Sequence, residues 1–242
     1  MIPRTLLIGA SGSLGLAVSD ELIKGGHSLL LTFRSKANLS NVAPRIKNSS
    51  DHVTVSPVLL DVTSEASIKR FYHSNKSKLG NLVYMVGAPL VFKKLTEEGW
   101  LDFTRHLEVQ VKGLFLLVKH LPVISHMKNI VVIGSSGVRG MPPSRLASYI
   151  VAKHALAGLV KVMAMELAPM GVRVNMVSPG VMGDGLTKQY PLHLLDLIKS
   201  KTPLRRLVLP KDVATAVRFL LDPSTDHLTG LDLPVDGGLS II

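Results

Sequence analysis

Short apolar runs alternate with longer segments of helical periodicity along most of the chain. The runs that we interpret as strands are residues 5–8, 28–32, 53–60, 82–86, 130–133, 172–177 and 231–235. The segments that predict helices are 13–24, 64–78, 96–118, 146–167 and 212–221, with a break in the third near Gly113. Nearly continuous apolar strands separated by helices indicate a parallel sheet that is covered on both faces.

This pattern predicts an α/β fold in which a doubly wound parallel sheet of about seven strands carries helices on both faces, a three-layer α/β/α arrangement. No internal repeat or low-complexity linker divides the chain, so we expect one domain over residues 1–242. Residues 36–50 are polar and irregular, which is typical of a surface connection. Residues 183–206 follow the carboxyl end of the sixth strand, where such folds bind ligands, and are predicted to form a lid over the site.

The composition excludes several classes of protein. An apolar content of 46% excludes a disordered chain, and the absence of cysteine excludes disulfides, thiol catalysis and cysteine-bound metals. The nine histidines show no ligand spacing, so no metal site is expected. No segment approaches the ~20 apolar residues of a membrane span, and glycines and serines interrupt the apolar residues near the N-terminus. We expect a cytoplasmic protein.

The positive charge is large but spread out. The formal net charge is +11, yet the longest basic runs are the pairs Lys93-Lys94 and Arg205-Arg206. A nucleic-acid site would concentrate its charge, whereas a diffuse positive field suits an acidic substrate or an acidic carrier protein. We therefore expect no nucleic-acid partner.

A glycine-rich loop joins the first predicted strand to the first predicted helix. It reads Gly9-Ala10-Ser11-Gly12-Ser13-Leu14-Gly15. Glycines let backbone N–H groups approach a pyrophosphate at the helix N-terminus, as in Rossmann-like dinucleotide sites. The loop could also be a structural turn only.

The residues after the second and third strands are candidates to bind the adenosine half of a dinucleotide. The second strand runs into Arg34 with no carboxylate nearby, and a guanidinium suits a 2′-phosphate. This favours NADP(H) over NAD(H) as cofactor. Asp61 closes the third strand, where it could accept a hydrogen bond from an adenine amine or act like a helix N-cap.

Three residues form a candidate catalytic group. Tyr149 and Lys153 stand four apart on a predicted helix, so their side chains share one face. A nearby ammonium group lowers the pKa of a phenol, which would make Tyr149 a usable acid or base. Ser136 follows the fifth strand and could bind a substrate oxygen.

With these pieces placed, the whole chain resembles the short-chain dehydrogenase/reductase family. The motifs that carry the resemblance are Gly9-x5-Gly15, Asp61-Val62, Ser136, Tyr149-x3-Lys153, Pro179-Gly180, the run Pro203–Arg206 with Pro210–Ala214, and the closing Leu231–Gly238. The chain looks most like the branch that contains 3-oxoacyl-acyl-carrier-protein reductases.

The resemblance implies roles for these residues. Tyr149 would donate a proton to a carbonyl oxygen, Lys153 would lower the tyrosine pKa and hold the nicotinamide ribose, and Ser136 would bind the substrate oxygen. The implied cofactor contacts are Gly9, Ser11, Gly12, Ser13, Leu14, Gly15, Arg34, Asp61, Val62, Gly87, Tyr149, Lys153, Pro179, Gly180 and Val181.

The chain departs from the family pattern at four places. Ser13 replaces a glycine, and residues 84–87 read Tyr-Met-Val-Gly instead of Asn-Asn-Ala-Gly. Gln110 stands where the family has a catalytic asparagine. Asp184 replaces a threonine near the nicotinamide, a role that Thr187 could take instead.

The resemblance implies an NADPH-dependent reductase of a 3-oxoacyl thioester on acyl carrier protein or CoA, as in fatty acid biosynthesis. The alternatives are a reductase or dehydrogenase of another small alcohol or ketone (steroid, sugar or polyketide), or a cofactor-binding member with little activity. The spacing of Tyr149 and Lys153 disfavours an enoyl reductase. Arg139 and Arg145 could flank the site entrance. The family also implies a homotetramer or homodimer, formed through the helices at 96–118 and 146–167.

Overall fold

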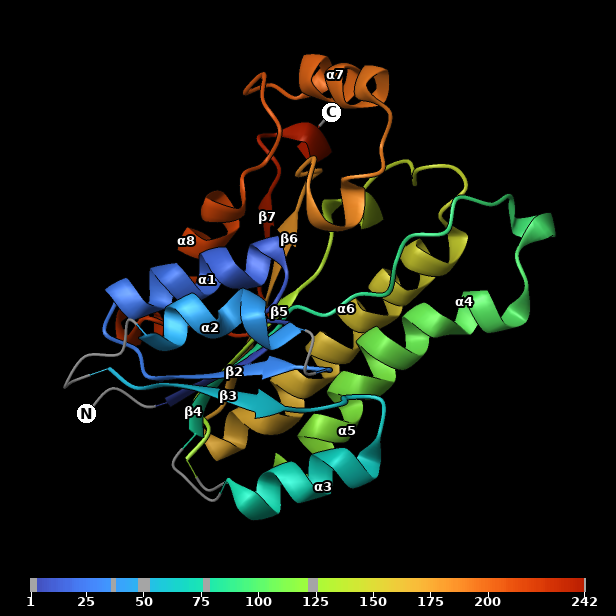
Figure 1. The fold of residues 1–242 in the computed structure, drawn as a ribbon. Helices are drawn as coiled ribbons and strands as arrows, with labels where there is room; N and C mark the ends of the chain where they lie inside the picture. The colour runs from blue at the N-terminus through green and yellow to red at the C-terminus, as the bar shows by residue number, and fades with distance from the viewer. Residues whose placement is uncertain (1–3, 36–37, 48–52, 76–78, 122–125, 242) are drawn as a thin grey trace.

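A seven-stranded parallel sheet lies at the centre of the molecule (Figure 1). This computed structural model describes residues 4–35, 38–47, 53–75, 79–121 and 126–241. The strands are β1 (Arg4–Ile8), β2 (Leu29–Phe33), β3 (Val55–Leu59), β4 (Leu79–Tyr84), β5 (Asn129–Ile133), β6 (Arg173–Pro179) and β7 (Asp232–Val235). Their order is β3-β2-β1-β4-β5-β6-β7, so the direction of winding reverses between β1 and β4. This confirms the predicted doubly wound fold and places a ligand crevice at that reversal.

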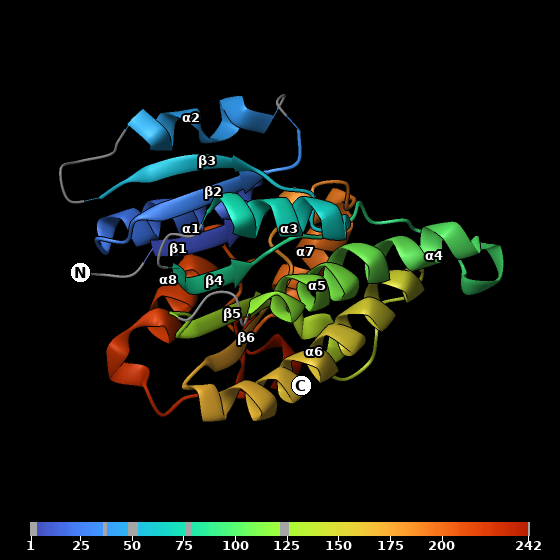
Figure 2. The ribbon, with the colours of Figure 1, turned by 90° about the horizontal axis from the view of Figure 1, so that it is seen from below.

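Two layers of helices cover the sheet (Figures 1 and 2). One layer contains α1 (Ser13–Lys24) and α8 (Pro210–Leu221), and the other contains α3 (Glu65–Ser74), α5 (Gly113–Lys119) and α6 (Ala147–Leu167). Successive side chains of β1 face opposite layers: Leu6 packs in the core beside α5 and α6, and Leu7 in the core beside α1 and α8. In the part of the chain that the structure describes, no helix has both the length and the apolar character needed to cross a membrane.

A helix that the sequence did not predict, α2 (Leu39–Lys47), lies beside the edge strand β3. It falls within residues 36–50, so the prediction of an irregular connection is wrong for residues 39–47. Polar composition and Pro44 conceal this helix in the sequence. Tertiary contacts stabilise it, because Val42 is fully buried and Arg45 makes a two-pronged ion pair with Asp20 at 2.7 and 2.9 Å. Residues 36, 37 and 48–50 lie outside the described residues.

The predicted helix over residues 96–118 is three segments that run together. They are α4 (Trp100–His106), a π-helical stretch (Leu107–Lys112) and α5, which begins at Gly113. The Gly113 N–H donates to the Glu108 carbonyl, which is one residue further back than the partner in an α-helix. The Val109 carbonyl is therefore free to accept a hydrogen bond from the Tyr84 hydroxyl, at 2.5 Å. A Cβ atom at position 113 would lie 2.3 Å from that hydroxyl oxygen, which explains why the break falls at a glycine.

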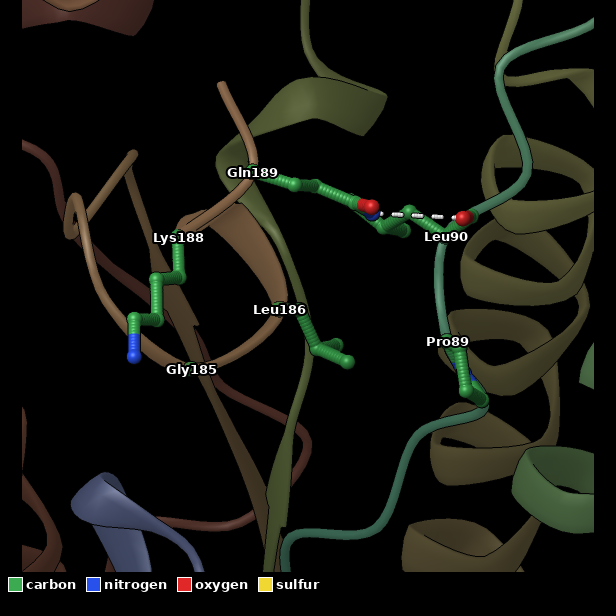
Figure 3. Close-up of a pocket in the computed structure, with 6 residues that line it drawn as sticks. All are labelled: Pro89, Leu90, Gly185, Leu186, Lys188 and Gln189. Carbon is green, nitrogen blue, oxygen red and sulfur yellow. Dashed lines mark hydrogen bonds between the residues drawn. The ribbon is translucent and has the colours of Figure 1, made fainter. Parts of the chain in front are cut away.

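The predicted lid, residues 183–206, is an ordered segment. It contains a 3₁₀ turn (Gly185–Thr187) and the helix α7 (Leu192–Lys201), which stands apart from both helical layers (Figure 1). Figure 3 shows the Gln189 amide donating to the Leu90 carbonyl, at 3.2 Å. Tyr190 also packs edge-to-face on Phe92, with ring centres 5.4 Å apart. These contacts join the lid to the loop after β4.

Candidate active site

A cavity of about 1580 Å³ opens at the carboxyl ends of the central strands. It is lined by every residue for which the sequence predicted a cofactor contact, namely Gly9, Ser11, Gly12, Ser13, Leu14, Gly15, Arg34, Asp61, Val62, Gly87, Tyr149, Lys153, Pro179, Gly180 and Val181. Ser136 lines the cavity as well, whereas Gln110 does not belong to its lining. A smaller recess of about 520 Å³ lies beside it, between the lid and residues Pro89 and Leu90 (Figure 3).

The glycine loop is shaped to receive an anion. Gly9 has a φ of +92°, and a Cβ on Gly15 would lie 2.3 Å from the Gly9 carbonyl oxygen, so both positions require glycine. Gly12 is the N-cap of α1 and offers no side-chain cap, and the first turn carries no acidic residue. A Cβ on Gly12 would meet no protein atom within 4 Å. The free N–H groups and this open space fit a pyrophosphate at the helix N-terminus.

The opposite end of the cavity holds Arg34 and Asp61. The Arg34 side chain is exposed and makes no ion pair with any described residue. One carboxylate oxygen of Asp61 accepts hydrogen bonds from both the backbone and the hydroxyl group of Thr63, at 2.9 and 2.7 Å. Asp61 is not the N-cap of α3, because Ser64 fills that position. Asp61 therefore shapes the turn after β3 and still faces the cavity.

Lys153 is tied to the sheet and not to the phenol of Tyr149. Its ammonium nitrogen donates to the Ile133 carbonyl at 2.8 Å and lies 5.7 Å from the centre of the Tyr149 ring. Burial lowers the pKa of Lys153 to about 7. Burial also raises the pKa of Tyr149 to about 12. The expected lowering of the Tyr149 pKa by Lys153 is thus wrong for this structure, since the loss of hydration dominates.

The serine whose side chain acts on Tyr149 is Ser135, one residue before the serine that the sequence singled out. Its hydrogen bond lowers the pKa of Tyr149 against the larger effect of burial. The Ser135 oxygen also accepts from the Gly137 N–H at 3.2 Å, which fixes the turn after β5. Ser136 is buried beside it and lines the same cavity. The sequence shows that two serines follow β5. Which of the two faces Tyr149 is decided by the turn that follows the strand.

Gln110 lies inside the protein, in the π-helical stretch. Its side chain is fully buried, and its amide nitrogen lies 2.9 Å from Nδ1 of His106. The His106 ring in turn packs edge-to-face on the Tyr149 ring, with centres 5.7 Å apart. The structure therefore joins Gln110 to the candidate catalytic group through His106, a residue that sequence reasoning missed because a lone histidine on a helix gives no signal.

The lid brings the departures near position 184 into the cavity. One carboxylate oxygen of Asp184 is buried and has no hydrogen-bond partner among the described residues. The Thr187 hydroxyl accepts from the Gly183 N–H and donates to the Asp184 carbonyl, both at 3.0 Å. Thr187 therefore holds the fold of the lid, while Asp184 keeps an oxygen free beside the cavity.

The two arginines predicted at the entrance differ. Arg139 lines the cavity but is paired with Asp232 at 2.9 Å. Arg145 is exposed at the cavity wall, where it adopts a left-handed backbone conformation with a φ of +62°. Of the two, Arg145 offers its charge to a ligand.

A family model described as enoyl-(acyl carrier protein) reductase matches residues 9–240. The chain belongs to the short-chain dehydrogenase/reductase family. Members of this family are oxidoreductases, and the cavity contains the family's tyrosine, lysine and glycine loop in their expected places.

Relatives within the short-chain dehydrogenase/reductase family match almost the whole chain. The 3-oxoacyl-[acyl-carrier-protein] reductase FabG of Thermotoga maritima is 27% identical over 244 residues, which cover 98% of this chain and 97% of that protein. The 2,5-dichloro-2,5-cyclohexadiene-1,4-diol dehydrogenase LinX of Sphingobium indicum is 28% identical over 243 residues, covering 98% and 95%.

Solved structures of the family show the same fold. The 3-ketoacyl-(acyl-carrier-protein) reductase from Brucella melitensis, complexed with NADH, superposes with a TM-score of 0.88 at 26% identity and 98% coverage of both chains. ElxO with NADP bound gives a TM-score of 0.86 at 27% identity and covers both chains fully, at 100%.

Proposed function

We propose that this protein is an NADPH-dependent carbonyl reductase that acts on a 3-oxoacyl thioester. The observation that carries the proposal is the shared cavity, in which the Tyr149 phenol faces the same space as a glycine loop suited to a pyrophosphate. Such a phenol is protonated at neutral pH and can serve as a proton donor. This is the state that a carbonyl reduction requires of Tyr149.

The residues divide the reaction between them. A bound nicotinamide cofactor would supply the hydride that reaches the carbonyl carbon. The Tyr149 hydroxyl gives its proton to the carbonyl oxygen, so hydride and proton together convert the ketone to an alcohol. Ser136 holds the substrate oxygen, and Ser135 holds the phenol of Tyr149. Lys153, anchored on the Ile133 carbonyl, offers its remaining N–H groups to the ribose of the cofactor.

The choice of NADPH rests on Arg34. Its exposed guanidinium lines the adenosine end of the cavity and has no competing carboxylate partner among the described residues. A guanidinium binds a phosphate through paired hydrogen bonds and gains little from a ribose hydroxyl. Among the structural relatives, one holds NADH and another holds NADP, so the preference of this chain depends on its own residues.

The choice of an acyl thioester rests on charge and on the relatives. The net charge of +11 provides a positive field that attracts an acidic acyl carrier protein, and Arg145 lies exposed at the cavity wall. FabG of Thermotoga maritima is named for this substrate class. The proposal includes a cytoplasmic location, a role in fatty acid biosynthesis and a homotetramer or homodimer built through α4, α5 and α6.

Two observations favour other reactions. The description of the matching family model favours reduction of an enoyl thioester, and the similarity to LinX favours oxidation of a small diol. Against the first, Tyr149 and Lys153 have the close spacing of the ketone reductases that the chain resembles. A cofactor-binding protein with little activity is the third alternative, and the complete set of Ser136, Tyr149 and Lys153 argues against it.

A substrate panel tests the proposal. The purified protein is mixed with NADPH and either acetoacetyl-CoA, crotonyl-CoA or a simple ketone, and NADPH consumption is followed by absorbance. Diol oxidation with NADP⁺ is measured in parallel. We expect kcat/KM for the 3-oxo thioester to exceed the others by at least about 10-fold, equivalent to about 1.4 kcal/mol of transition-state stabilisation. Turnover of crotonyl-CoA alone, of the diol alone, or of no substrate despite NADPH binding would contradict it.

A further inference from the structure

A buried histidine packs against the candidate catalytic tyrosine. His106 ends α4, is only 1% exposed, and presents its ring to Tyr149 at an interplanar angle of 80°. This geometry is favourable because the positive edge of one ring meets the negative face of the other. His106 is not part of the cavity lining within the described residues, so it contacts Tyr149 from the protein side. The contact restricts the plane of the phenol ring and hence the position of its hydroxyl group.

Gln110 fixes the orientation of that histidine. Its amide nitrogen, a donor only, lies 2.9 Å from Nδ1 of His106, so Nδ1 accepts and the ring proton of the neutral histidine sits on Nε2. Both side chains are buried, so no solvent competes for this hydrogen bond. The His106 ring is thus held on one side by Gln110 and packs on the other against Tyr149.

The π-helical stretch sets the place of Gln110. The stretch forms because the Tyr84 hydroxyl donates a hydrogen bond to the Val109 carbonyl, and because Gly113 leaves room for that hydroxyl. Single π-helical turns often occur at functional sites, where they re-aim one side chain. The departures at Tyr84 and Gln110 therefore belong to one connected structure, which ends at Tyr149.

The charged and polar groups around His106 keep it neutral. Burial has the largest effect and lowers the pKa of His106. The positive charges of Lys153 on α6 and Arg105 on α4 lower it further. Glu98 and the Pro89 carbonyl raise the pKa of His106. Among the described residues, His106 Nε2 has no hydrogen-bond partner. A neutral ring can accept from Gln110, whereas an imidazolium could not.

We propose that His106 is a positioning residue for Tyr149, and that Gln110 acts in the reaction through His106 and not by direct contact with the substrate or with Lys153. The inference rests on the proposed function, because it assigns Tyr149 the proton transfer. A ring that is free to swing would misplace the hydroxyl group, and a misplacement of ~1 Å can cost about 100-fold in rate.

Kinetics of four variants test the inference. His106→Leu removes the ring, His106→Phe keeps the ring but not the nitrogen that Gln110 bonds, and Gln110→Leu removes the partner. We expect kcat to fall about 10-fold or more in His106→Leu, with the KM values of both substrates changed by no more than about 2-fold. The double variant His106→Phe/Gln110→Leu should be no slower than His106→Phe alone, since the two residues act as one unit.

The matched control is His120→Phe. His120 packs on Tyr72 with ring centres 6.5 Å apart, at a tilted angle of 53°, and pairs with Glu65. None of these three residues lines the cavity. The kcat of His120→Phe should equal that of the unmodified protein. If His106→Phe fails to fold, His106→Leu and Gln110→Leu still decide. Unchanged kcat in the His106 variants, or losses that multiply in the double variant, would overturn the inference.

A second measurement needs neither cofactor nor turnover. The chain has four tyrosines, so NMR of protein labelled in the tyrosine rings resolves each one. His106→Leu and Gln110→Leu should both shift the Tyr149 ring signals, and His120→Phe should shift those of Tyr72. If the Tyr149 ring signals have the same chemical shifts in both variants as in the unmodified protein, the inference is overturned, even when no substrate is turned over. An unmodified protein that reduces no ketone contradicts the proposed function alone, provided that the Tyr149 shifts occur.

Discussion

The ammonium group of Lys153 donates its hydrogen bond to the Ile133 carbonyl at 2.8 Å, which joins α6 to the end of β5. The bond holds the lysine at a fixed distance from Tyr149, with 5.7 Å between the nitrogen and the ring centre. It also leaves a cation only 5% exposed, without a carboxylate partner in the described part of the chain. Burial therefore lowers the pKa of Lys153 to about 7.

This arrangement predicts how the stability of the cofactor-free protein varies with pH. The folded pKa lies near 7 and the unfolded value is 10.5, so between these values the unfolded chain binds more protons. The free energy of unfolding should therefore rise with pH across this window, by up to about 1.4 kcal/mol per pH unit from this group. Urea unfolding of the unmodified protein and of Lys153→Met at several pH values measures the difference. Parallel pH dependences in the two proteins would show that Lys153 keeps an ordinary pKa.

The glycine loop predicts opposite outcomes for two substitutions. Gly12→Ala should change the free energy of unfolding by no more than about 0.5 kcal/mol from that of the unmodified protein. The reason is that its Cβ would meet no protein atom within 4 Å. Its methyl group would occupy the space for the pyrophosphate, so NADPH binding should weaken at least about 10-fold. Gly15→Ala should instead destabilise the fold by about 1–3 kcal/mol or more, because its Cβ would lie 2.3 Å from the Gly9 carbonyl oxygen. Thermal unfolding and fluorescence titration distinguish the two. Normal NADPH affinity in Gly12→Ala would contradict the assignment of the loop.

The Tyr84 hydroxyl predicts a change that can be separated from ordinary loss of stability. Tyr84→Phe removes the partner of the Val109 carbonyl, and Tyr72→Phe removes the partner of the Leu117 carbonyl in an equally buried place. Each should lower the free energy of unfolding by about 1–3 kcal/mol. Only Tyr84→Phe should lower kcat as well, since it loosens the π-helical stretch that holds Gln110. Equal kcat values in the two folded variants would contradict a link between Tyr84 and the site.

Arg34 predicts the cofactor preference. Arg34→Ala should raise the Kd of NADPH by about 10- to 100-fold, the loss expected for charge-assisted hydrogen bonds to a phosphate. The Kd of NADH should change by no more than about 2-fold, so NADH is the internal control. Fluorescence titration with each cofactor makes the comparison. An equal loss for both cofactors would mean that Arg34 does not distinguish the 2′-phosphate.

The features that the sequence predicted well depend on local pattern. The bounds of α1 follow from the glycine loop before Ser13 and from Gly25 and Gly26 after Lys24. The apolar runs identified the strands of the sheet, and the chain order of the motifs brought Tyr149, Lys153 and Ser136 to one cavity. Periodicity and spacing are sufficient for these because each depends on neighbours in the chain.

The features that it missed depend on contacts between distant residues. The helix α2 is stabilised by the pair of Arg45 with Asp20, which no local pattern reveals. The turn of Gln110 toward His106 follows from the Tyr84 hydroxyl, which lies in another strand. The raised pKa of Tyr149 follows from burial, and burial is a property of the folded molecule.

The most direct test of the account is the rate of carbonyl reduction by Tyr149→Phe. The substitution removes only the hydroxyl group, so NADPH should still bind through the glycine loop and Arg34. We expect kcat/KM for the 3-oxo thioester to fall at least about 100-fold, the usual worth of a positioned proton donor. A variant that binds NADPH and still reduces the ketone within about 3-fold of the unmodified rate would contradict the role of Tyr149 as the proton donor.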